Sequence, residues 1–359
     1  MARIWFNIPW QDMDAPGDRS EEHGLGKENV IPNKRNHGTE ELAGGAPKRI
    51  RDDGPRSRNR GCSYLAERFP LPGDDEDITF EETSHTYTFR GRVVEKSSTG
   101  VLHTYFDEFD GKATIAQYYE RWKALEDVRY WSIIQHTMRD VDDSMHLTDA
   151  QAKEAILERW SDEGKRASEL GTQVHLYCER VLNAESGEWG NAVEHSPDIQ
   201  REATQFKRFL KSTLVVRNEL EPLRTELLVW YTIGSKIVSA GQIDALFVAR
   251  TSREIYLIDW KRVRSKYSLD PQAVGFLNRC GYGLCSRVPD TRFHKYSLQC
   301  SLYAEMLQSA HGIDVGGNLY IVRMHAEQDE PECVQCHNYR QLACQMLLAE
   351  YQRVYENGV

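Results

Sequence analysis

The order of helix-like and strand-like segments after Lys165 is the feature that most constrains the fold. Apolar residues recur at helical spacing over residues 165–182 and 199–214. Three strand-like segments follow, and the chain then continues through a helix, a strand and a closing helix; these six segments span residues 223–233, 238–249, 255–260, 297–310, 318–324 and 339–355. This order predicts an α/β fold with a mixed central β-sheet flanked by helices.

Residues 62–164 predict an extension that packs on this core of residues 165–359. Residues 85–89 alternate and are rich in aromatic residues and threonine, and a short apolar run follows Arg90 and Gly91. This pattern predicts a β-hairpin. The hydroxyl groups of residues 97–99 can cap a helix that follows the hairpin.

Two further helices are expected in the same extension. Residues 114–139 carry apolar side chains at three- and four-residue spacing, which predicts one amphipathic helix. Thr148 and Gln151 form a capping-box pattern that opens another helix ending near Trp160. The extension is therefore a hairpin followed by helices.

The first 61 residues differ in composition from the rest of the chain. Residues 14–60 are rich in glycine, proline and charged residues and almost lack aromatic residues. Such a segment cannot bury enough apolar surface to offset its ordering entropy, so we expect a disordered tail. Two basic clusters, residues 34–35 and 48–51, resemble a bipartite nuclear import signal, and a solvated charged tail is the alternative. The expected location is therefore the nucleus, with the mitochondrion as the alternative.

Length, charge and cysteine content exclude several classes of protein. The 359 residues contain no apolar run of the ~18 residues that a membrane helix needs, and the first residues do not read as a leader. A net charge of −10 argues against a protein that coats nucleic acid, although a narrow DNA channel needs only local positive charge. Eight scattered cysteines predict free thiols in a reducing compartment.

Four short stretches carry residues that suit metal chemistry. They contribute His175 on an expected helix, Glu226 and Asp244 on expected strands, and the pair Asp259 and Lys261. Asp259 and Lys261 alternate with apolar neighbours, so in a strand their side chains share one face. Burying either charge alone costs several kcal/mol, so the pair indicates a site rather than ordinary core.

These residue types suit the hydrolysis of a phosphodiester. The reaction needs a hard cation that neutralises charge on the phosphate and lowers the pKa of the attacking water. Carboxylate oxygens suit Mg²⁺, and an added imidazole tolerates Mn²⁺. Asp244 and Asp259 can reach one ion from neighbouring strands, and His175 can approach from its helix. Glu226 can complete the cluster, and Lys261 can hold the water or stabilise the phosphate charge.

The set resembles the PD-(D/E)XK nuclease superfamily, and its RecB-like branch in particular. In that branch a G-x-x-x-H helix precedes a strand glutamate, a G-x-x-D motif, a D-x-K motif and a Q-x-x-x-Y motif. The same order runs here from Gly171 to Tyr303. The stretch Y-E-R-W-K at 119–123, the stretch I-D-W-K at 258–261 and the closing helix are similar to the mitochondrial genome maintenance exonuclease group.

The resemblance implies a restriction-endonuclease-like core and a deoxyribonuclease that depends on Mg²⁺ or Mn²⁺. It implies that His175, Asp244 and Asp259 bind the metal and that Lys261 is catalytic. It further implies a DNA substrate that is single-stranded or has free ends, and no membrane association.

Residues around these motifs are expected to position the substrate. In the family, the residues that match Gln299 and Tyr303 position the active site or the DNA strand. One position departs from the pattern, because threonine often follows the D-x-K lysine and Arg262 stands there in this chain. Arg264 and Lys266 continue a basic run that can contact backbone phosphates.

Cysteines near the C-terminus suggest an alternative cofactor. Some RecB-like nucleases hold an iron–sulfur cluster with one upstream and three downstream cysteines, and Cys333, Cys336 and Cys344 lie downstream here. The upstream candidates fit poorly, because Cys62 adjoins the expected tail and Cys178 lies within an expected helix. The segment that holds the first two downstream thiols also reads as a strand, so we expect no cluster.

Two hypotheses from different classes follow from these patterns. The first is a metal-dependent DNA nuclease, in particular an exonuclease directed to single strands or ends. The alternative is a non-catalytic DNA-binding or scaffold module on the same fold. Such modules usually lose an aspartate or the lysine, and the chain keeps both Asp259 and Lys261. An RNA-directed nuclease ranks lower, because no RNA-reading module is recognisable.

Overall fold

The computed structural model describes residues 64–71, 77–138, 146–184, 194–264, 269–274 and 278–356. The expected tail with its two basic clusters, and Lys266, lie outside these ranges. None of the helices within them is both long enough and apolar enough to cross a membrane.

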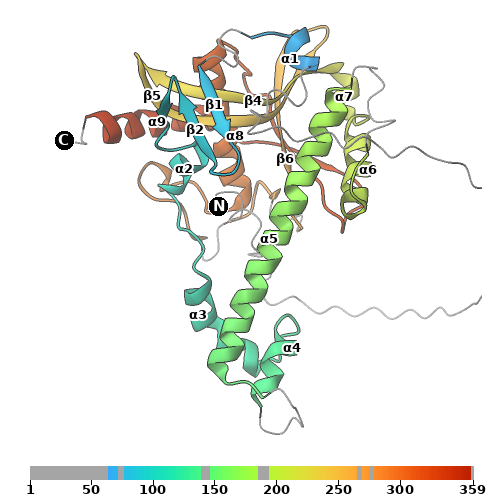
Figure 1. Ribbon diagram of the computed structural model, residues 1–359, viewed down its shortest axis with the longest axis vertical. Coiled ribbons are helices and arrows are strands. Elements are labelled where there is room, and N and C mark those ends of the chain that lie inside the picture. The colour runs from blue at the N-terminus through green and yellow to red at the C-terminus, as the bar shows by residue number, and fades with distance from the viewer. Residues whose placement is uncertain are drawn as a thin grey trace, which may run out of the picture.

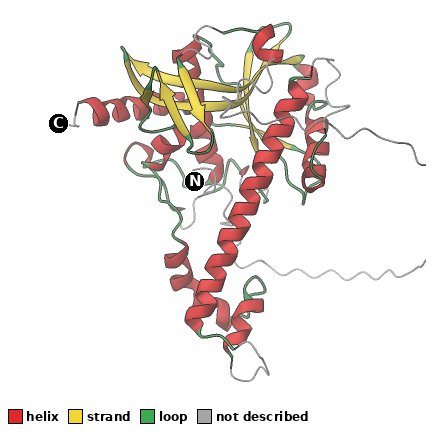
Figure 2. Ribbon diagram, viewed as in Figure 1, coloured by secondary structure: helices red, strands yellow, loops and turns green. Residues whose placement is uncertain are grey.

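A five-stranded sheet forms the centre of the protein (Figure 1; Figure 2), with its strands in the order β4-β5-β6-β7-β8. The strands are β4 (Leu220–Ile233), β5 (Lys236–Ala249), β6 (Ile255–Lys261), β7 (Leu319–Arg323) and β8 (Glu332–Gln335). Strands β6 and β7 run parallel and the other neighbours antiparallel. A parallel pair needs a crossover, which contains helix α8 (Arg292–His311). The mixed sheet expected from the sequence is confirmed.

Helices cover both faces of this sheet. Helices α8 and α9 (Arg340–Tyr355) pack on one face, where Leu257 of β6 joins their apolar core. Helix α6 (Gln200–Phe209) and the C-terminal half of α5 (Asp149–Leu182) pack on the other face, where Ile258 joins a second core. Neighbouring residues of one strand thus serve opposite faces, as strand geometry requires.

Short helical segments complete the core. They are α1 (Tyr64–Arg68), the 3₁₀ turn Pro197–Ile199, α7 (Thr213–Arg217) and the 3₁₀ turn Gly283–Cys285. The single helix expected over residues 199–214 is therefore wrong. Helix α6 ends at Phe209, and Ser212 has extended backbone angles that start α7 as a separate turn.

The N-terminal hairpin packs on one end of the central sheet. Strands β1 (Ile78–Glu81), β2 (Thr86–Phe89) and β3 (Arg92–Val93) form a small antiparallel sheet. Its apolar side chains share a core with Trp230 and Ala240 of β4 and β5. Helix α2 (Ser98–His103) follows, and its cap Ser97 accepts a hydrogen bond from the Gly100 amide. The expected hairpin and the expected cap are both confirmed.

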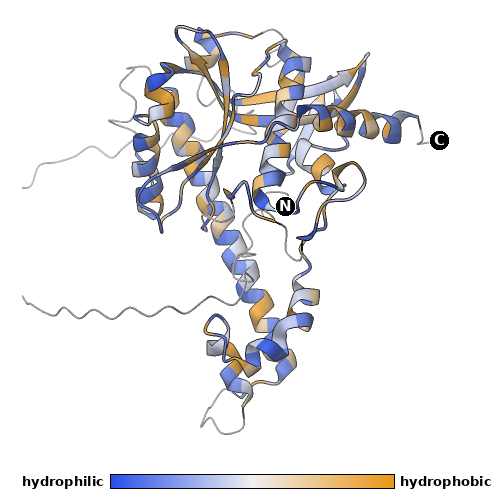
Figure 3. Ribbon diagram, turned by 180° about the vertical axis from the view of Figure 1, so that it is seen from behind, coloured by the Kyte–Doolittle hydropathy of each residue, from blue (hydrophilic) through white to orange (hydrophobic). Residues whose placement is uncertain are grey.

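A helical arm extends from the sheet along α5. It consists of α3 (Gly111–Ala124), α4 (Trp131–Ile134), the 3₁₀ turn Gln135–Thr137 and the N-terminal half of α5. In Figure 1 the arm lies at the end of α5 farthest from the sheet. It has a small core of its own, which includes Tyr119, Trp122, Ile156 and Trp160. In Figure 3 its ribbon is mostly hydrophilic with short hydrophobic bands, as a thin unit with a small core requires.

Two expectations about these helices are wrong. Helix α5 is continuous over 34 residues, so the expected interruption after Trp160 is absent and the expected boundary at 164/165 lies inside one helix. Its N-terminus carries the predicted capping box. In contrast, the helix expected over residues 114–139 breaks after Ala124, because Glu126 has a φ of 48° and a left-handed residue cannot continue a right-handed helix.

Candidate metal centre and active site

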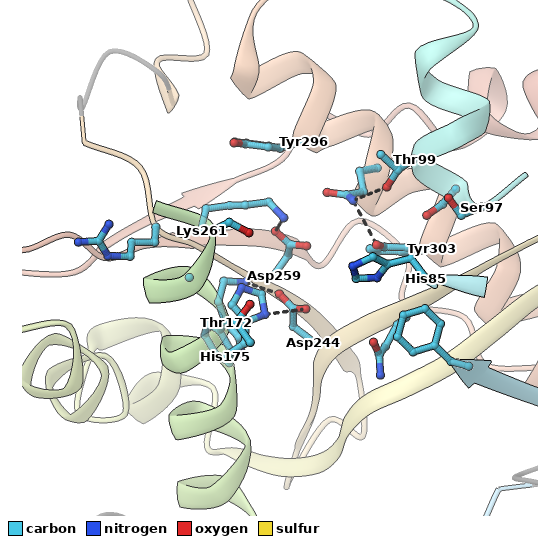
Figure 4. A pocket seen from close by; sticks show the side chains of 18 of the residues that line it. His85, Ser97, Thr99, Thr172, His175, Asp244, Asp259, Lys261, Tyr296 and Tyr303 are labelled. Carbon is cyan, nitrogen blue, oxygen red and sulfur yellow. Dashed lines mark hydrogen bonds and ion pairs between the residues drawn. The ribbon is translucent and has the colours of Figure 1, made fainter. Parts of the chain in front are cut away.

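One face of α5 contributes a wall of the pocket drawn in Figure 4. Ser168, Gly171, Thr172 and His175 line this pocket, at the three- and four-residue spacing that places side chains on one helix face. His175 Nδ1 lies 3.3 Å from Asp244 Oδ1 and 4.0 Å from Glu226 Oε1. The histidine thus meets both carboxylates of the adjacent strands.

Glu226 has an unusual backbone for a strand residue. Its φ is 47°, although it is not glycine. It lies opposite Asp244 in the β4–β5 register, between the pairs Thr225↔Ala245 and Leu227↔Ile243. The Gln242 side-chain amide donates to the Glu226 carbonyl at 3.1 Å. A conformation of this kind costs about 1–3 kcal/mol and is found preferentially at functional sites.

Asp244 lies where two strands of the sheet separate. The regular β5–β6 pairing covers residues 245–248 of β5 and stops at Ala245↔Ile258, so Asp244, the residue that precedes Ala245, has no partner in this register. The Trp260 backbone N–H donates to Asp244 Oδ2 at 2.8 Å, so a side-chain carboxylate takes the place of a strand partner. This bond fixes the carboxylate with its other oxygen toward His175.

Asp259 and Lys261 form an ion pair on the opposite side of β6 from Trp260. Lys261 Nζ lies 2.7 Å from Asp259 Oδ2, which confirms that the two side chains share one strand face. The same Nζ lies 4.9 Å from the ring centroid of Tyr296 on α8. Asp259 is only 2% exposed, so the ammonium group compensates a buried carboxylate.

Burial and mutual charge shift the ionisation of these groups. Burial alone would raise the pKa of Asp244, but His175, Lys261 and the Trp260 amide outweigh it and lower the pKa to about 2. Burial raises the pKa of Asp259 to about 6, against the opposing effect of Lys261. For Lys261, the two aspartates overcome burial and raise the pKa. The ammonium group therefore stays charged at neutral pH.

The donor set fits a divalent cation. Within the described ranges, His175, Glu226 and Asp244 form the group of potential ligands whose donor atoms all lie within 4.8 Å of one another. One imidazole nitrogen and two carboxylate oxygens suit Mn²⁺, and the oxygens suit Mg²⁺. The sequence predicted Asp259 as a ligand and Glu226 as a residue that can complete the cluster. The structure brings Glu226 beside His175 and Asp244 and pairs Asp259 with Lys261.

Helices α8 and α2 form the polar wall across from α5. Gln299 Nε2 donates to Tyr303 Oη at 3.1 Å and lies 3.5 Å from Thr99 Oγ1. A Cβ at Gly241 would lie 2.6 Å from the Tyr303 ring, so the ring packs directly on the glycine backbone. The G-x-x-D and Q-x-x-x-Y motifs are therefore joined by packing, with glycine required at their contact.

The basic residues after β6 lie in different surroundings. Arg262 lines the pocket, yet its Nε donates to Glu202 Oε1 of α6 at 2.8 Å in a buried ion pair. Arg264 is exposed and pairs with Glu327 at 2.8 Å. Of the residues expected to contact phosphate, Arg262 is thus already paired with Glu202 of α6. Lys266 lies outside the described residues.

Several residues that line this pocket belong to none of the motifs recognised in the sequence. They come from the hairpin, from α2, from β5 and from α8, and are Phe80, His85, Tyr87, Ser97, Ser98, Thr99, Gln242 and Tyr296. Aromatic alternation at 85–89 was visible in the sequence but predicted only a hairpin. Its position over the motif residues could not be inferred, because long-range packing brings it there.

The downstream cysteines lie apart from the pocket lining. Cys333 is exposed and Cys336 is buried at the end of β8, and Cys344 is exposed on α9. Cys62 falls outside the described residues. The expectation that no iron–sulfur cluster is held stays a prediction.

Comparisons with known proteins add little to this picture. Neither a family model nor a curated protein matches the chain. Among solved structures, a protein of Eubacterium rectale provisionally named an exonuclease is similar at 14% identity and a TM-score of 0.31, over 54% of this chain and 68% of the other. The protein SSO0001 is similar at 13% identity and a TM-score of 0.24, over 54% and 71%. Values this low show no shared family, so the function must be argued from the site.

Proposed function

We propose that the protein is a metal-dependent nuclease that hydrolyses phosphodiester bonds of DNA. The observation that carries this proposal is one pocket in which three potential metal ligands, His175, Glu226 and Asp244, adjoin the buried ion pair of Asp259 and Lys261. Both elements suit phosphodiester hydrolysis, because negative charge accumulates on the phosphate while a water molecule loses a proton. A scaffold module needs neither.

His175, Glu226 and Asp244 would hold the cation, either Mg²⁺ or Mn²⁺. When bound, the ion supplies Lewis acidity to the phosphate and lowers the pKa of water. The Trp260 amide orients Asp244 for this task, as partners beyond the ligand shell do in metal sites generally. The left-handed backbone of Glu226 brings its carboxylate, the third proposed ligand, beside His175 and Asp244.

Lys261 and Asp259 would act on the reacting groups themselves. Lys261 carries a fixed positive charge between Asp259 and the Tyr296 ring, so it can stabilise the phosphate as charge develops. Asp259 keeps the ammonium group in place, and its remaining oxygen can orient water. Tyr303 and Gln299 line the same cavity and would position the DNA strand.

Cleavage of labelled DNA tests this proposal. We expect products from a single-stranded oligonucleotide with Mg²⁺ or Mn²⁺ and none with a chelator. Lys261→Met should lower the cleavage rate by roughly 100- to 1,000-fold, the range found when one group that stabilises negative charge in the transition state is removed. Lys165→Met, at a lysine whose side chain is 61% exposed, is the matched control and should cleave normally.

Direct metal binding provides a second readout. Thermal unfolding with increasing Mn²⁺ should show stabilisation of the wild type, because a ligand that binds only the folded state raises its stability. Asp244→Asn should lose this shift, whereas Asp314→Asn at an exposed carboxylate should keep it. DNA binding without cleavage under any metal would leave the non-catalytic module as the better account.

A further inference from the structure

The Gln299 side chain on α8 contacts two hydroxyl groups in the pocket wall across from α5. Its Nε2 donates to Tyr303 Oη at 3.1 Å and lies 3.5 Å from Thr99 Oγ1 of α2, the longer of the two contacts. Gln299 is 6% exposed, and all three residues line the pocket that contains the potential metal ligands. An amide nitrogen can only donate, so both hydroxyl oxygens act as acceptors toward it.

The Thr99 hydroxyl therefore retains a proton that it can donate. A hydroxyl group has one proton and two lone pairs, and one lone pair of Thr99 Oγ1 faces Gln299. Within the described part of the chain, Thr99 makes no hydrogen bond to an acceptor, whereas Tyr303 has Ser98 as a second hydrogen-bonding neighbour. Thr99 is partly buried and lines the pocket, so its proton is available to a ligand there.

The other polar groups of the pocket make such a donor useful. Figure 4 shows Thr99 and Tyr303 on one side of the Asp244 and Asp259 carboxylates, with His175 on the other side. An ionised carboxylate only accepts hydrogen bonds, so it offers no hydrogen bond to a phosphate oxygen. The donors that bind a phosphate must therefore come from other side chains that line the pocket.

We propose that Thr99 donates a hydrogen bond to a non-bridging oxygen of a DNA backbone phosphate in this pocket, and that Gln299 is the positioning residue that directs the hydroxyl. Serine and threonine hydroxyls commonly contact DNA phosphates. A hydrogen bond to a charged oxygen is also stronger than one between neutral groups. This inference rests on the proposed nuclease function and adds a substrate contact that lies outside the recognised motifs.

Methylphosphonate DNA tests which oxygen the hydroxyl contacts. In this analogue a methyl group replaces one non-bridging oxygen, and the two stereoisomers differ in which oxygen is replaced. Both lose the phosphate charge, so a difference in affinity between them reports the contacts of one oxygen. Binding is measured with the methylphosphonate at each position of a single-stranded oligonucleotide in turn, in a Lys261→Met background that keeps the DNA intact. We expect one position at which the stereoisomers differ roughly 10-fold in affinity, the usual effect of one hydrogen bond to a charged group.

Substitution of Thr99 provides the matching change in the protein. In the same background, Thr99→Val keeps the side-chain shape, and it should weaken binding of the unmodified strand roughly 10-fold and abolish the stereoisomer difference. Thr99→Ser should restore both. The hydroxyl is neutral, so the salt dependence of affinity should not change. Thr204→Val is the matched control, because this exposed hydroxyl donates within α6 to the Gln200 carbonyl at 2.9 Å.

Gln299→Met tests whether the glutamine acts through Thr99. Methionine is similar in size but has no N–H group, so the Thr99 hydroxyl loses the donor that orients it. The stereoisomer difference should shrink, and Gln299→Met combined with Thr99→Val should lose little more affinity than Thr99→Val alone. Fully additive losses would overturn the positioning role of Gln299. Thermal unfolding of each variant shows whether the protein stays folded.

The outcomes separate this inference from the proposed function. The inference fails if folded Thr99→Val binds the unmodified strand as tightly as its background, or if the stereoisomer difference persists in this variant. The absence of a stereoisomer difference at every position of the strand would overturn it as well. In each case metal-dependent cleavage by the wild type still supports the nuclease proposal. If no metal supports cleavage but the stereoisomer difference depends on Thr99, the nuclease proposal fails and the phosphate contact stands.

Discussion

Two buried groups of charges lie next to each other in the sequence and differ in their balance. The pocket cluster contains three carboxylates, from Glu226, Asp244 and Asp259, with the histidine His175 and one lysine, Lys261. The next residue, Arg262, forms a buried one-to-one pair with Glu202, whose side chains are 10% and 0% exposed. Lys261 faces α8 and Arg262 faces α6, as alternation along a strand predicts.

This difference in charge balance indicates which of the two groups is suited to binding a ligand. A buried one-to-one pair neutralises itself and serves the fold. A buried excess of carboxylates is unfavourable, and either protonation or a cation from outside relieves it. The pocket cluster is therefore suited to metal binding and the Glu202–Arg262 pair to holding α6 against the sheet.

Removing one carboxylate of the pocket cluster should have the largest effect on activity. Glu226→Gln removes a proposed metal ligand and with it several kcal/mol of transition-state stabilisation, so we expect cleavage to fall roughly 1,000-fold. In a chelator, the melting temperature should be equal to or higher than that of the wild type, because repulsion among the carboxylates is reduced. Paired cleavage and unfolding measurements check both. A clear drop in metal-free stability would show that Glu226 serves the fold instead.

Breaking the Glu202–Arg262 pair should have the opposite effect, with a loss of stability and no loss of Mn²⁺ binding. Glu202→Gln leaves Arg262 buried without its counter-charge, which typically costs about 3–5 kcal/mol of stability. Chemical denaturation measures this loss, and Mn²⁺ should still stabilise the folded variant. Replacing both partners with Glu202→Leu and Arg262→Met should recover most of the stability. A Glu202→Gln variant that folds normally but loses Mn²⁺ binding would contradict the distinction.

A substitution at the contact between Gly241 and Tyr303 should have a smaller effect on stability. Gly241→Ala places a Cβ within 2.6 Å of the Tyr303 ring, and overpacking of this kind typically costs about 1–3 kcal/mol. Tyr303→Leu in the same chain should relieve the loss, so that the two substitutions are not additive when unfolding is measured. Additive losses would mean that Gly241 is required for a reason other than this contact.

The smallest effect is expected at Arg264. Its pair with Glu327 is exposed, so Arg264→Gln should leave thermal stability unchanged. If Arg264 contacts a phosphate, as expected from the sequence, the slope of DNA affinity against salt should fall by one phosphate contact, about 0.9 on duplex DNA and about 0.7 on a single strand. Arg262, buried against Glu202, offers the comparison. An unchanged slope would remove Arg264 from the DNA-binding surface.

Local patterns were sufficient for much of the fold. Strand and helix periodicity predicted the mixed sheet, and the hydroxyl at Ser97 and the capping box at Thr148 predicted two helix starts. Periodicity failed where a single backbone angle decided the outcome. Glu126 ends α3 with a positive φ that no apolar pattern reveals, and the apolar stripe continues past it.

The sequence by itself determined which residue types were available for chemistry and the elements on which they lie, because motif spacing and side-chain periodicity are properties of the local chain. The tertiary structure decided which of them meet. Glu226 joins His175 and Asp244, while Asp259 turns to Lys261. The separation of β5 from β6 on the N-terminal side of Ala245 and the left-handed backbone at Glu226 set these partners, and both depend on how the sheet and the helices pack together.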